Sequence, residues 1–146
     1  NTAYFVTTCT AGARPLFEDW ACTQVVVDAL WWLGRAGRIW VLGYVVMPDY
    51  VHLAFVLREG ATLSAVVKVF KGFVSRRLRA EQRWTGQIWQ AAFFDRAVRD
   101  RRYAHTVLDY VHENPVRKGL CAVPEQYPFS SANPPVSRRM DWWWLE

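Results

Sequence analysis

Two apolar runs dominate the chain, Ile39–Val46 and Tyr50–Leu57, and only a Met-Pro-Asp segment separates them. A connection this short cannot make the crossover that parallel strands require, so the runs are predicted to form an antiparallel hairpin. Successive side chains of a strand point to opposite faces, which places Tyr50 and His52 on the same face of the second strand. The sequence therefore predicts a histidine presented from the centre of a sheet.

The other elements alternate in type along the chain. They are, in order, a strand at Tyr4–Thr8, a helix at Glu18–Leu33, a helix at Thr62–Glu81, a strand at Ile88–Val98 and a helix at Asp100–Asn114. Together with the hairpin, this order predicts an α+β fold, a ferredoxin-like antiparallel sheet with helices packed on it and an added C-terminal helix. We expect Pro115 to stop that last helix, because the residue before a proline is disfavoured in the helical conformation.

A length of 146 residues with 52% hydrophobic content is typical of one domain with a substantial core. We assign residues 1–132 to this domain and residues 133–146 to a C-terminal tail. The tail contains Trp142–Trp144, which either cover an apolar surface or stack on bases. No apolar run approaches the roughly 18 residues that cross a bilayer, and no signal peptide is recognisable at the start. We therefore expect a cytoplasmic protein with no membrane partner.

The three cysteines, Cys9, Cys22 and Cys121, are widely spaced and form no C-x-x-C pair. This spacing argues against a disulfide framework and against a thiolate zinc site. We expect all three to be small core residues.

Basic residues are concentrated in the second half of the chain, where fourteen of the eighteen lysines and arginines follow position 67. Clustered positive charge favours a polyanionic partner, although an ordinary solvated basic surface gives the same pattern. The residues we predict to contact the phosphates of such a partner form two groups, one on the helix at Thr62–Glu81 and one flanking the last helix: Lys68, Lys71, Arg76 and Arg79, then Arg96, Arg99, Arg117 and Lys118.

Two positions in the last predicted helix are candidates for chemistry. Tyr110 and Asn114 are four residues apart and are therefore neighbours on one helix face. Periodicity alone leaves Tyr110 either a core aromatic or a functional residue. His52 has the same two interpretations, a hydrogen-bonded core histidine or a ligand.

Motifs distributed along the chain resemble those of the REP-associated tyrosine transposases, which belong to the HUH superfamily of single-stranded-DNA transposases. The resemblance extends from about Tyr4 to Ala132. It is carried by Gly43–Leu53, Ile88–Gln90, Phe93–Arg96, Asp109–Leu120 and Tyr127–Ser131.

The resemblance implies a function and a set of site residues. Tyr110 corresponds to the nucleophile that cleaves and rejoins single-stranded DNA at hairpins through a 5′-phosphotyrosine, which makes the protein an endonuclease and strand transferase. His52 is implied as a catalytic residue and, with Asn114, as a ligand of a divalent metal, Mg²⁺ or Mn²⁺. The REP-associated type also implies a monomer rather than a dimer. A metal would polarise the scissile phosphate while the phenol attacks it.

The chain departs from the family pattern at one metal ligand. The family's His-x-His motif reads Tyr50-Val51-His52 here, and a neutral phenol is a poor ligand for Mg²⁺ or Mn²⁺. Three outcomes follow: Tyr50 coordinates as a phenolate, Glu113 substitutes for the missing ligand, or the protein binds DNA hairpins without cutting them efficiently. A further alternative is an RNA-binding ferredoxin-like domain.

Overall fold

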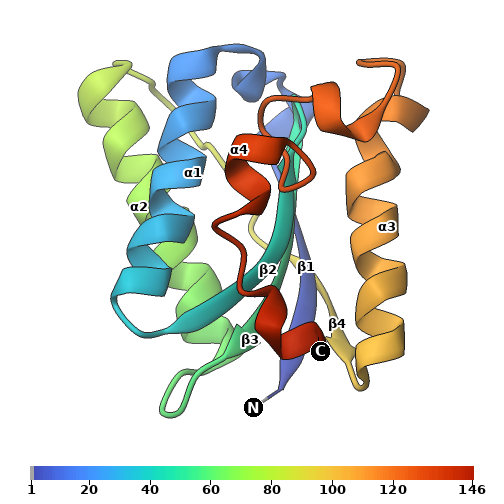
Figure 1. Cartoon of the computed structure of the whole chain (residues 1–146). Helices are drawn as coiled ribbons and strands as arrows, with labels where there is room; N and C mark the ends of the chain where they lie inside the picture. Colours follow the sequence, from blue (N-terminus) through green and yellow to red (C-terminus); the bar gives the residue numbers. More distant parts are fainter. Residues whose placement is uncertain (1) are drawn as a thin grey trace.

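The computed structural model describes residues 2–146, which form one antiparallel sheet with helices on both of its faces (Figure 1). The strand order is β2-β3-β1-β4, and all three strand pairs are antiparallel. The elements are β1 Ala3–Cys9, α1 Trp20–Arg35, β2 Ile39–Val46, β3 Tyr50–Leu57, α2 Leu63–Glu81, β4 Phe94–Val98, α3 Arg101–Arg117 and the short α4 Pro134–Ser137. The predicted α+β class is confirmed.

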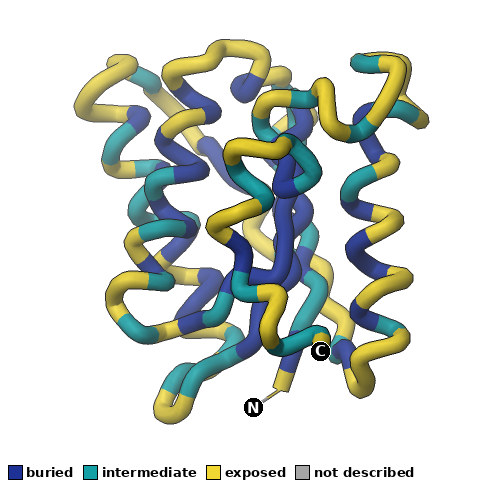
Figure 2. Tube along the Cα trace, in the orientation of Figure 1, coloured by how far each residue is buried: buried dark blue, intermediate teal, exposed yellow. Residues whose placement is uncertain are grey.

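The hairpin of β2 and β3 has the predicted bounds, and both strands are almost entirely buried. Burial on both faces follows from the layers, since α1 and α2 cover one face of the sheet and α3 covers the other (Figure 1). Figure 2 shows the result as a buried sheet between helices whose outer sides are exposed. One core cluster lies between the sheet and α1 and α2, and a smaller one lies beneath α3.

The predicted end of α3 at Asn114 is wrong, because the helix passes through Pro115 and ends at Arg117. Pro115 lies in the last turn, where its missing N–H removes a single hydrogen bond, and its ring is buried in the core. The final turn is closed by the Lys118 N–H, which donates to the carbonyl of Asn114 at 3.1 Å. Gly119 follows with a positive φ of 73°, as expected at a helix end. The added turn brings Arg117 back beside Tyr110.

The strand predicted at Ile88–Val98 is shorter in the structure, where β4 begins only at Phe94. The residues just before β4 are held by hydrogen bonds to α2 instead of by regular pairing with a neighbouring strand. Lys71 of α2 donates its ammonium hydrogens to the carbonyls of Gln90 at 2.9 Å and Ala92 at 3.2 Å. Lys71, predicted to contact phosphate, is thus already bonded within the protein.

α3 packs closely over the hairpin at Gly43 of β2. A Cβ atom at this position would lie 2.4 Å from Cδ2 of Leu108 on α3 and 3.0 Å from Oγ of Ser131. The first separation is far below van der Waals contact, so a larger residue would force the Leu108 side chain to move, and glycine fits the observed approach. This contact sets the height of α3 above the sheet.

The C-terminal segment runs along the outer edge of β2, where it satisfies backbone groups of that edge strand (Figure 1). The Asp141 N–H donates to the carbonyl of Val41 at 2.8 Å, and the indole N–H of Trp142 donates to the carbonyl of Leu42 at 2.9 Å. Trp143 packs edge-on against Trp40 of the same strand, with ring centroids 5.3 Å apart. These tryptophans therefore cover part of the sheet.

Over residues 2–146, no helix combines the length and the apolar character needed to cross a membrane.

Candidate active site

The sheet face beneath α3 carries the candidate residues in rows. Strand pairing places His52 of β3 opposite Thr7 of β1, and Thr7 opposite Phe94 of β4. In the adjacent row, Phe5 of β1 lies opposite Arg96 of β4. Side chains of one row point to the same face, so the sheet register alone aligns a histidine, a threonine and a phenylalanine beneath α3.

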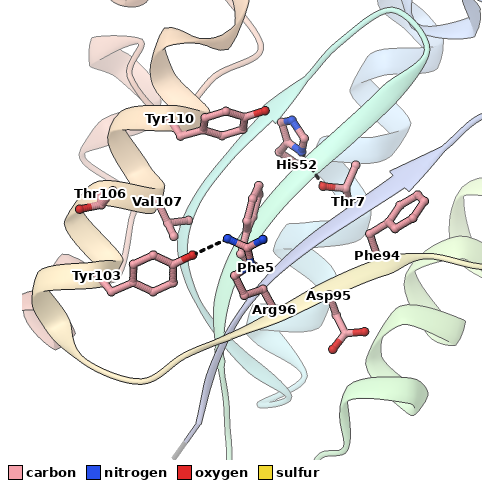
Figure 3. A pocket seen from close by; sticks show the side chains of 10 residues that line it. All are labelled: Phe5, Thr7, His52, Phe94, Asp95, Arg96, Tyr103, Thr106, Val107 and Tyr110. Carbon is pink, nitrogen blue, oxygen red and sulfur yellow. Dashed lines mark hydrogen bonds between the residues drawn. The ribbon is translucent and has the colours of Figure 1, made fainter.

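Tyr110 projects from α3 over these rows and points toward His52 in Figure 3. Its ring centroid lies 5.6 Å from that of His52 and 6.0 Å from that of Phe5. The side chain is 47% exposed, whereas Val111 and Asn114 on the same helix are buried. Of the two interpretations left open by the sequence, a fully packed core aromatic therefore does not describe Tyr110. Its phenol is accessible.

Arg117 holds Tyr110 from two turns further along α3. Its guanidinium donates to the backbone carbonyl of Tyr110 at 2.8 Å, and its central carbon lies 4.4 Å from the centroid of the tyrosine ring. A cation over an aromatic face is attracted by the ring electrons. This contact limits the orientations of the phenol and places a positive charge beside it.

His52 is buried, with only 6% of its surface exposed, and its Nδ1 shares a hydrogen bond of 2.8 Å with Oγ1 of Thr7. Burial, with the charge of Arg117 as the smaller cause, lowers the pKa of His52 to about 4. The imidazole is consequently neutral at pH 7. Among residues 2–146, no side chain or backbone group hydrogen-bonds the other ring nitrogen.

Tyr50 occupies the position where the resemblance implies a second histidine. Its hydroxyl donates to Oδ1 of Asn114 at 2.6 Å, and Asn114 is 4% exposed. Burial raises the pKa of Tyr50 above its usual range, so the phenol keeps its proton. The amide oxygen that the resemblance implies as a metal ligand is therefore the acceptor of a short hydrogen bond.

The donor atoms near His52 do not fit a tightly bound Mg²⁺ or Mn²⁺. These ions prefer carboxylate and other anionic or carbonyl oxygens, whereas the groups here are a neutral imidazole, a neutral phenol and an amide oxygen already bonded to that phenol. Within the described chain, no group of three or more His, Cys, Asp or Glu side chains could hold a metal. Glu113 is exposed, and burial, with the charge of Glu113 as a smaller cause, raises the pKa of Cys121.

Two pockets flank the Tyr110–His52 pair. We call the first, of about 500 Å³, the aromatic pocket; its lining includes Phe5, Phe94, Arg96, Tyr103 and Tyr110 (Figure 3). We call the second, of about 440 Å³, the basic pocket; its lining includes Cys9, Tyr50, Tyr110, Asn114, Arg117 and Lys118. Tyr110 and His52 line both pockets, so an extended ligand can pass across them from one pocket to the other.

The structure separates the residues predicted to contact DNA into two sets. Arg117 and Lys118 line the basic pocket, Arg96 lines the aromatic pocket, and the exposed Arg99 lies in the turn that leads into α3. The set on α2 lies on the helical layer across the sheet from α3 (Figure 1), and consists of Lys68, Lys71, Arg76 and Arg79.

Four residues of the site were absent from the sequence predictions, namely Tyr103 and the sheet residues Thr7, Phe5 and Phe94. Alternation along the predicted strand Tyr4–Thr8 could have placed Phe5 and Thr7 on one face. Their partners could not be found in this way, because register between distant strands leaves no local signal.

Comparisons with known proteins identify the family and the fold of the chain. Residues 1–114 match the family described as "Transposase IS200 like". A REP-associated tyrosine transposase from Escherichia coli K12 is 31% identical over 108 residues, covering 68% of this chain and 59% of the relative. A Haemophilus influenzae protein that bears the same family name is 29% identical over 110 residues, covering 66% of this chain and 62% of the relative. The chain thus matches about three fifths of the length of these curated relatives.

A solved structure shares the fold over most of the chain. It is that of a REP-associated tyrosine transposase bound to a REP hairpin, with a TM-score of 0.77 and 23% sequence identity. The match covers 95% of this chain and 81% of the other. At this level of identity the similarity establishes the architecture, a four-stranded sheet with helices packed on it.

Proposed function

This chain belongs to the IS200-like transposases and, within them, to the REP-associated tyrosine transposase type, and from this premise we propose that it cleaves and rejoins single-stranded DNA beside a hairpin. The solved neighbour was captured with a REP hairpin, which supports the same class of ligand here. The single observation that carries the proposal is the exposed phenol of Tyr110 above His52, on the wall shared by the two pockets.

The proposed chemistry is a phosphoryl transfer to Tyr110. The phenol oxygen forms a bond to the scissile phosphorus, and the bond from phosphorus to the 3′ oxygen breaks. The proton of the phenol is transferred, through His52 or water, to the departing 3′ oxygen, which becomes a free 3′ hydroxyl. The strand downstream of the break stays on the protein through its 5′ phosphate as a phosphotyrosine, and attack by a 3′ hydroxyl reverses the sequence to rejoin DNA.

His52 and Arg117 would assist this step in different ways. A neutral imidazole can accept the proton of the phenol, and the low pKa of His52 supports a neutral ring at pH 7. The guanidinium of Arg117 lies against the ring of Tyr110 and would offset negative charge developing there. Because α3 packs on the sheet of its own chain, one chain supplies all of these groups, which supports action as a monomer.

The test is formation of a covalent adduct with a labelled DNA hairpin that carries single-stranded flanks. We expect an adduct that resists denaturation, disappears in Tyr110→Phe and persists in the control Tyr4→Phe, which changes a tyrosine of β1 on the other face of the sheet. Parallel reactions with chelator, Mg²⁺ and Mn²⁺, and with RNA of the same sequence, define the metal requirement and the nucleic acid. An adduct that survives Tyr110→Phe would contradict the assignment of the nucleophile.

A second candidate function, favoured by the hydrogen bond between Tyr50 and Asn114, is hairpin binding with little or no cleavage. In this case Tyr50 keeps a divalent cation from binding tightly beside His52. The test is restoration: Tyr50→His should strengthen Mn²⁺ binding about 10- to 100-fold by calorimetry and should create cleavage that the parent lacks. Efficient cleavage by the parent protein in chelator would exclude this candidate.

A further inference from the structure

We propose that the aromatic pocket holds one unpaired base of the DNA strand, next to the phosphate that Tyr110 attacks. This inference rests on the proposed single-stranded-DNA substrate and adds the position and the contacts of one nucleotide. The starting observation is Phe94, whose side chain is 68% exposed although it stands in a strand and on the face covered elsewhere by α3. In Figure 3 its ring stands at the open end of the pocket.

The lining of the pocket has the shape and chemistry that a base requires. Phe5 forms part of the floor, and the phenol of Tyr103 closes the side toward α3 (Figure 3). Aromatic rings on an open surface are the platforms on which proteins stack unpaired bases. A volume of about 500 Å³ is within the range of pockets that take a single small ligand.

The sheet register fixes how far this base lies from the chemistry. Phe94, Thr7 and His52 occupy one row, so Phe94 is two strands away from His52. Adjacent strands are about 4.8 Å apart, which puts the ring of Phe94 on the order of 10 Å from His52. A nucleotide extends over such a distance from its phosphate, through the sugar, to its base. A base on Phe94 is therefore compatible with its own phosphate lying at Tyr110.

The distribution of charge indicates which part of the DNA strand lies on each side of Tyr110. Arg117 and Lys118 lie on one side of Tyr110, in the basic pocket, and suit a DNA backbone. On the other side, Arg96 donates to the hydroxyl of Tyr103 at 2.9 Å and lies beside the aromatic rings. Asp95 also lines this pocket, and its carboxylate points away from Arg96 and Tyr103 in Figure 3. The backbone of the hairpin side thus lies over the basic pocket and the unpaired base over the aromatic pocket.

The test measures binding, so that it does not depend on cleavage. Hairpins with single-stranded flanks are prepared with one abasic site or one 2-aminopurine at each flank position in turn, and affinity is measured by fluorescence anisotropy. Phe94→Ala and Phe94→Leu should each weaken binding of the intact hairpin about tenfold, and Phe94→Tyr should retain it. Trp20→Ala, which removes an exposed aromatic of α1 from the other side of the sheet, is the matched control and should have no effect.

The decisive result is position dependence. An abasic site at one nucleotide flanking the cleaved bond should weaken binding by the parent about as much as Phe94→Ala does, and the two changes together should cost no more than either alone. At that position 2-aminopurine should be quenched by the parent and not by Phe94→Ala. Equal losses at every position, or no loss in Phe94→Ala, would overturn the proposal. If no covalent adduct forms but binding shows this position dependence, the result contradicts the proposed cleavage and still supports the base pocket.

Discussion

At the scale of single residues, the pair formed by Tyr50 and Asn114 decides what the site can do. A buried amide oxygen needs a hydrogen-bond partner, and the phenol supplies one at 2.6 Å. The same contact uses the oxygen that a cation would need. Tyr50 thus binds the amide oxygen of Asn114 in an internal hydrogen bond.

Tyr50→Phe should destabilise the protein, because it leaves Oδ1 of Asn114 buried without its donor. We expect the free energy of unfolding to fall by about 1–3 kcal/mol in urea denaturation. Tyr103→Phe, which removes a hydroxyl bonded at the surface to Arg96, should change it by less than about 0.5 kcal/mol. Equal effects of the two substitutions would mean that the Tyr50 hydroxyl is not needed to satisfy Asn114.

His52 should make stability depend on pH in a defined window. Its pKa in the folded state is about 4, below the ordinary value of 6.5, so between these values the unfolded chain binds a proton that the folded chain does not. Stability is therefore greatest above about pH 6.5 and should fall by up to about 3 kcal/mol as the pH drops toward 4. Urea denaturation in the presence of a chelator, repeated across this pH range, measures the slope of the free energy of unfolding against pH.

The control for this pH dependence is the position of the histidine. His52→Gln should remove most of the slope, while the same change at the exposed His105 should leave it intact. Burial also lowers the pKa of His112, which contributes a share that His112→Gln measures separately. A slope unchanged in His52→Gln would show that folding does not lower the pKa of His52.

At the scale of elements, the position of α3 relative to the hairpin controls the distance between Tyr110 and His52. The two residues belong to different elements, and no hydrogen bond between their side chains is present in residues 2–146. Their spacing is instead fixed by how closely α3 approaches β2 at Gly43. A change far from the phenol can therefore alter the reaction geometry.

Gly43→Ala should lower both stability and activity, since the new methyl group would collide with Leu108 and force α3 outward. We expect a loss of about 1–3 kcal/mol in the free energy of unfolding, together with a lower yield of the Tyr110 adduct. The matched control is Gly34→Ala in α1, where no atom lies within 4 Å of the added carbon. This second change should stabilise the helix by up to about 1 kcal/mol. Similar behaviour of both variants would contradict the packing argument.

The elements that local signals determine were predicted well. The hairpin has its predicted bounds, and Thr62 caps α2 by accepting a hydrogen bond from the N–H of Ala65. The misplaced boundaries are tertiary effects: Pro115 stays helical where its ring is buried, and β4 begins where pairing with β1 becomes possible. The site was also predicted only in part. The resemblance indicated Tyr110, but the alignment of Phe94 with His52 depends on strand register, which the sequence does not reveal.

At the scale of the whole molecule, the basic residues divide between two faces. Tyr110 lies on the α3 face with Arg96, Arg117 and Lys118, whereas the basic stripe of α2 lies across the sheet (Figure 1). A strand of DNA bound at Tyr110 contacts the first face directly. The basic residues of α2, namely Lys68, Lys71, Arg76 and Arg79, contact phosphates only if the DNA hairpin extends around the sheet to that face.

The salt dependence of hairpin binding separates these two possibilities. Each phosphate contact adds about 0.7–0.9 to the negative slope of log affinity against log salt concentration. Lys118→Gln should reduce the magnitude of that slope by about 1, and Arg76→Gln on α2 should leave it unchanged. A reduced slope in Arg76→Gln would place the hairpin on both faces.

The C-terminal segment that lines β2 affects how the protein folds during its synthesis. Val41 donates its N–H to the carboxylate of Asp141, and Leu42 accepts from Trp142, each across 100 positions of sequence. During synthesis the hairpin is complete long before these partners leave the ribosome. Throughout that interval the edge of β2 is open to pairing with other nascent chains. The edge of β2 is covered only after Asp141 and Trp142 have been synthesised.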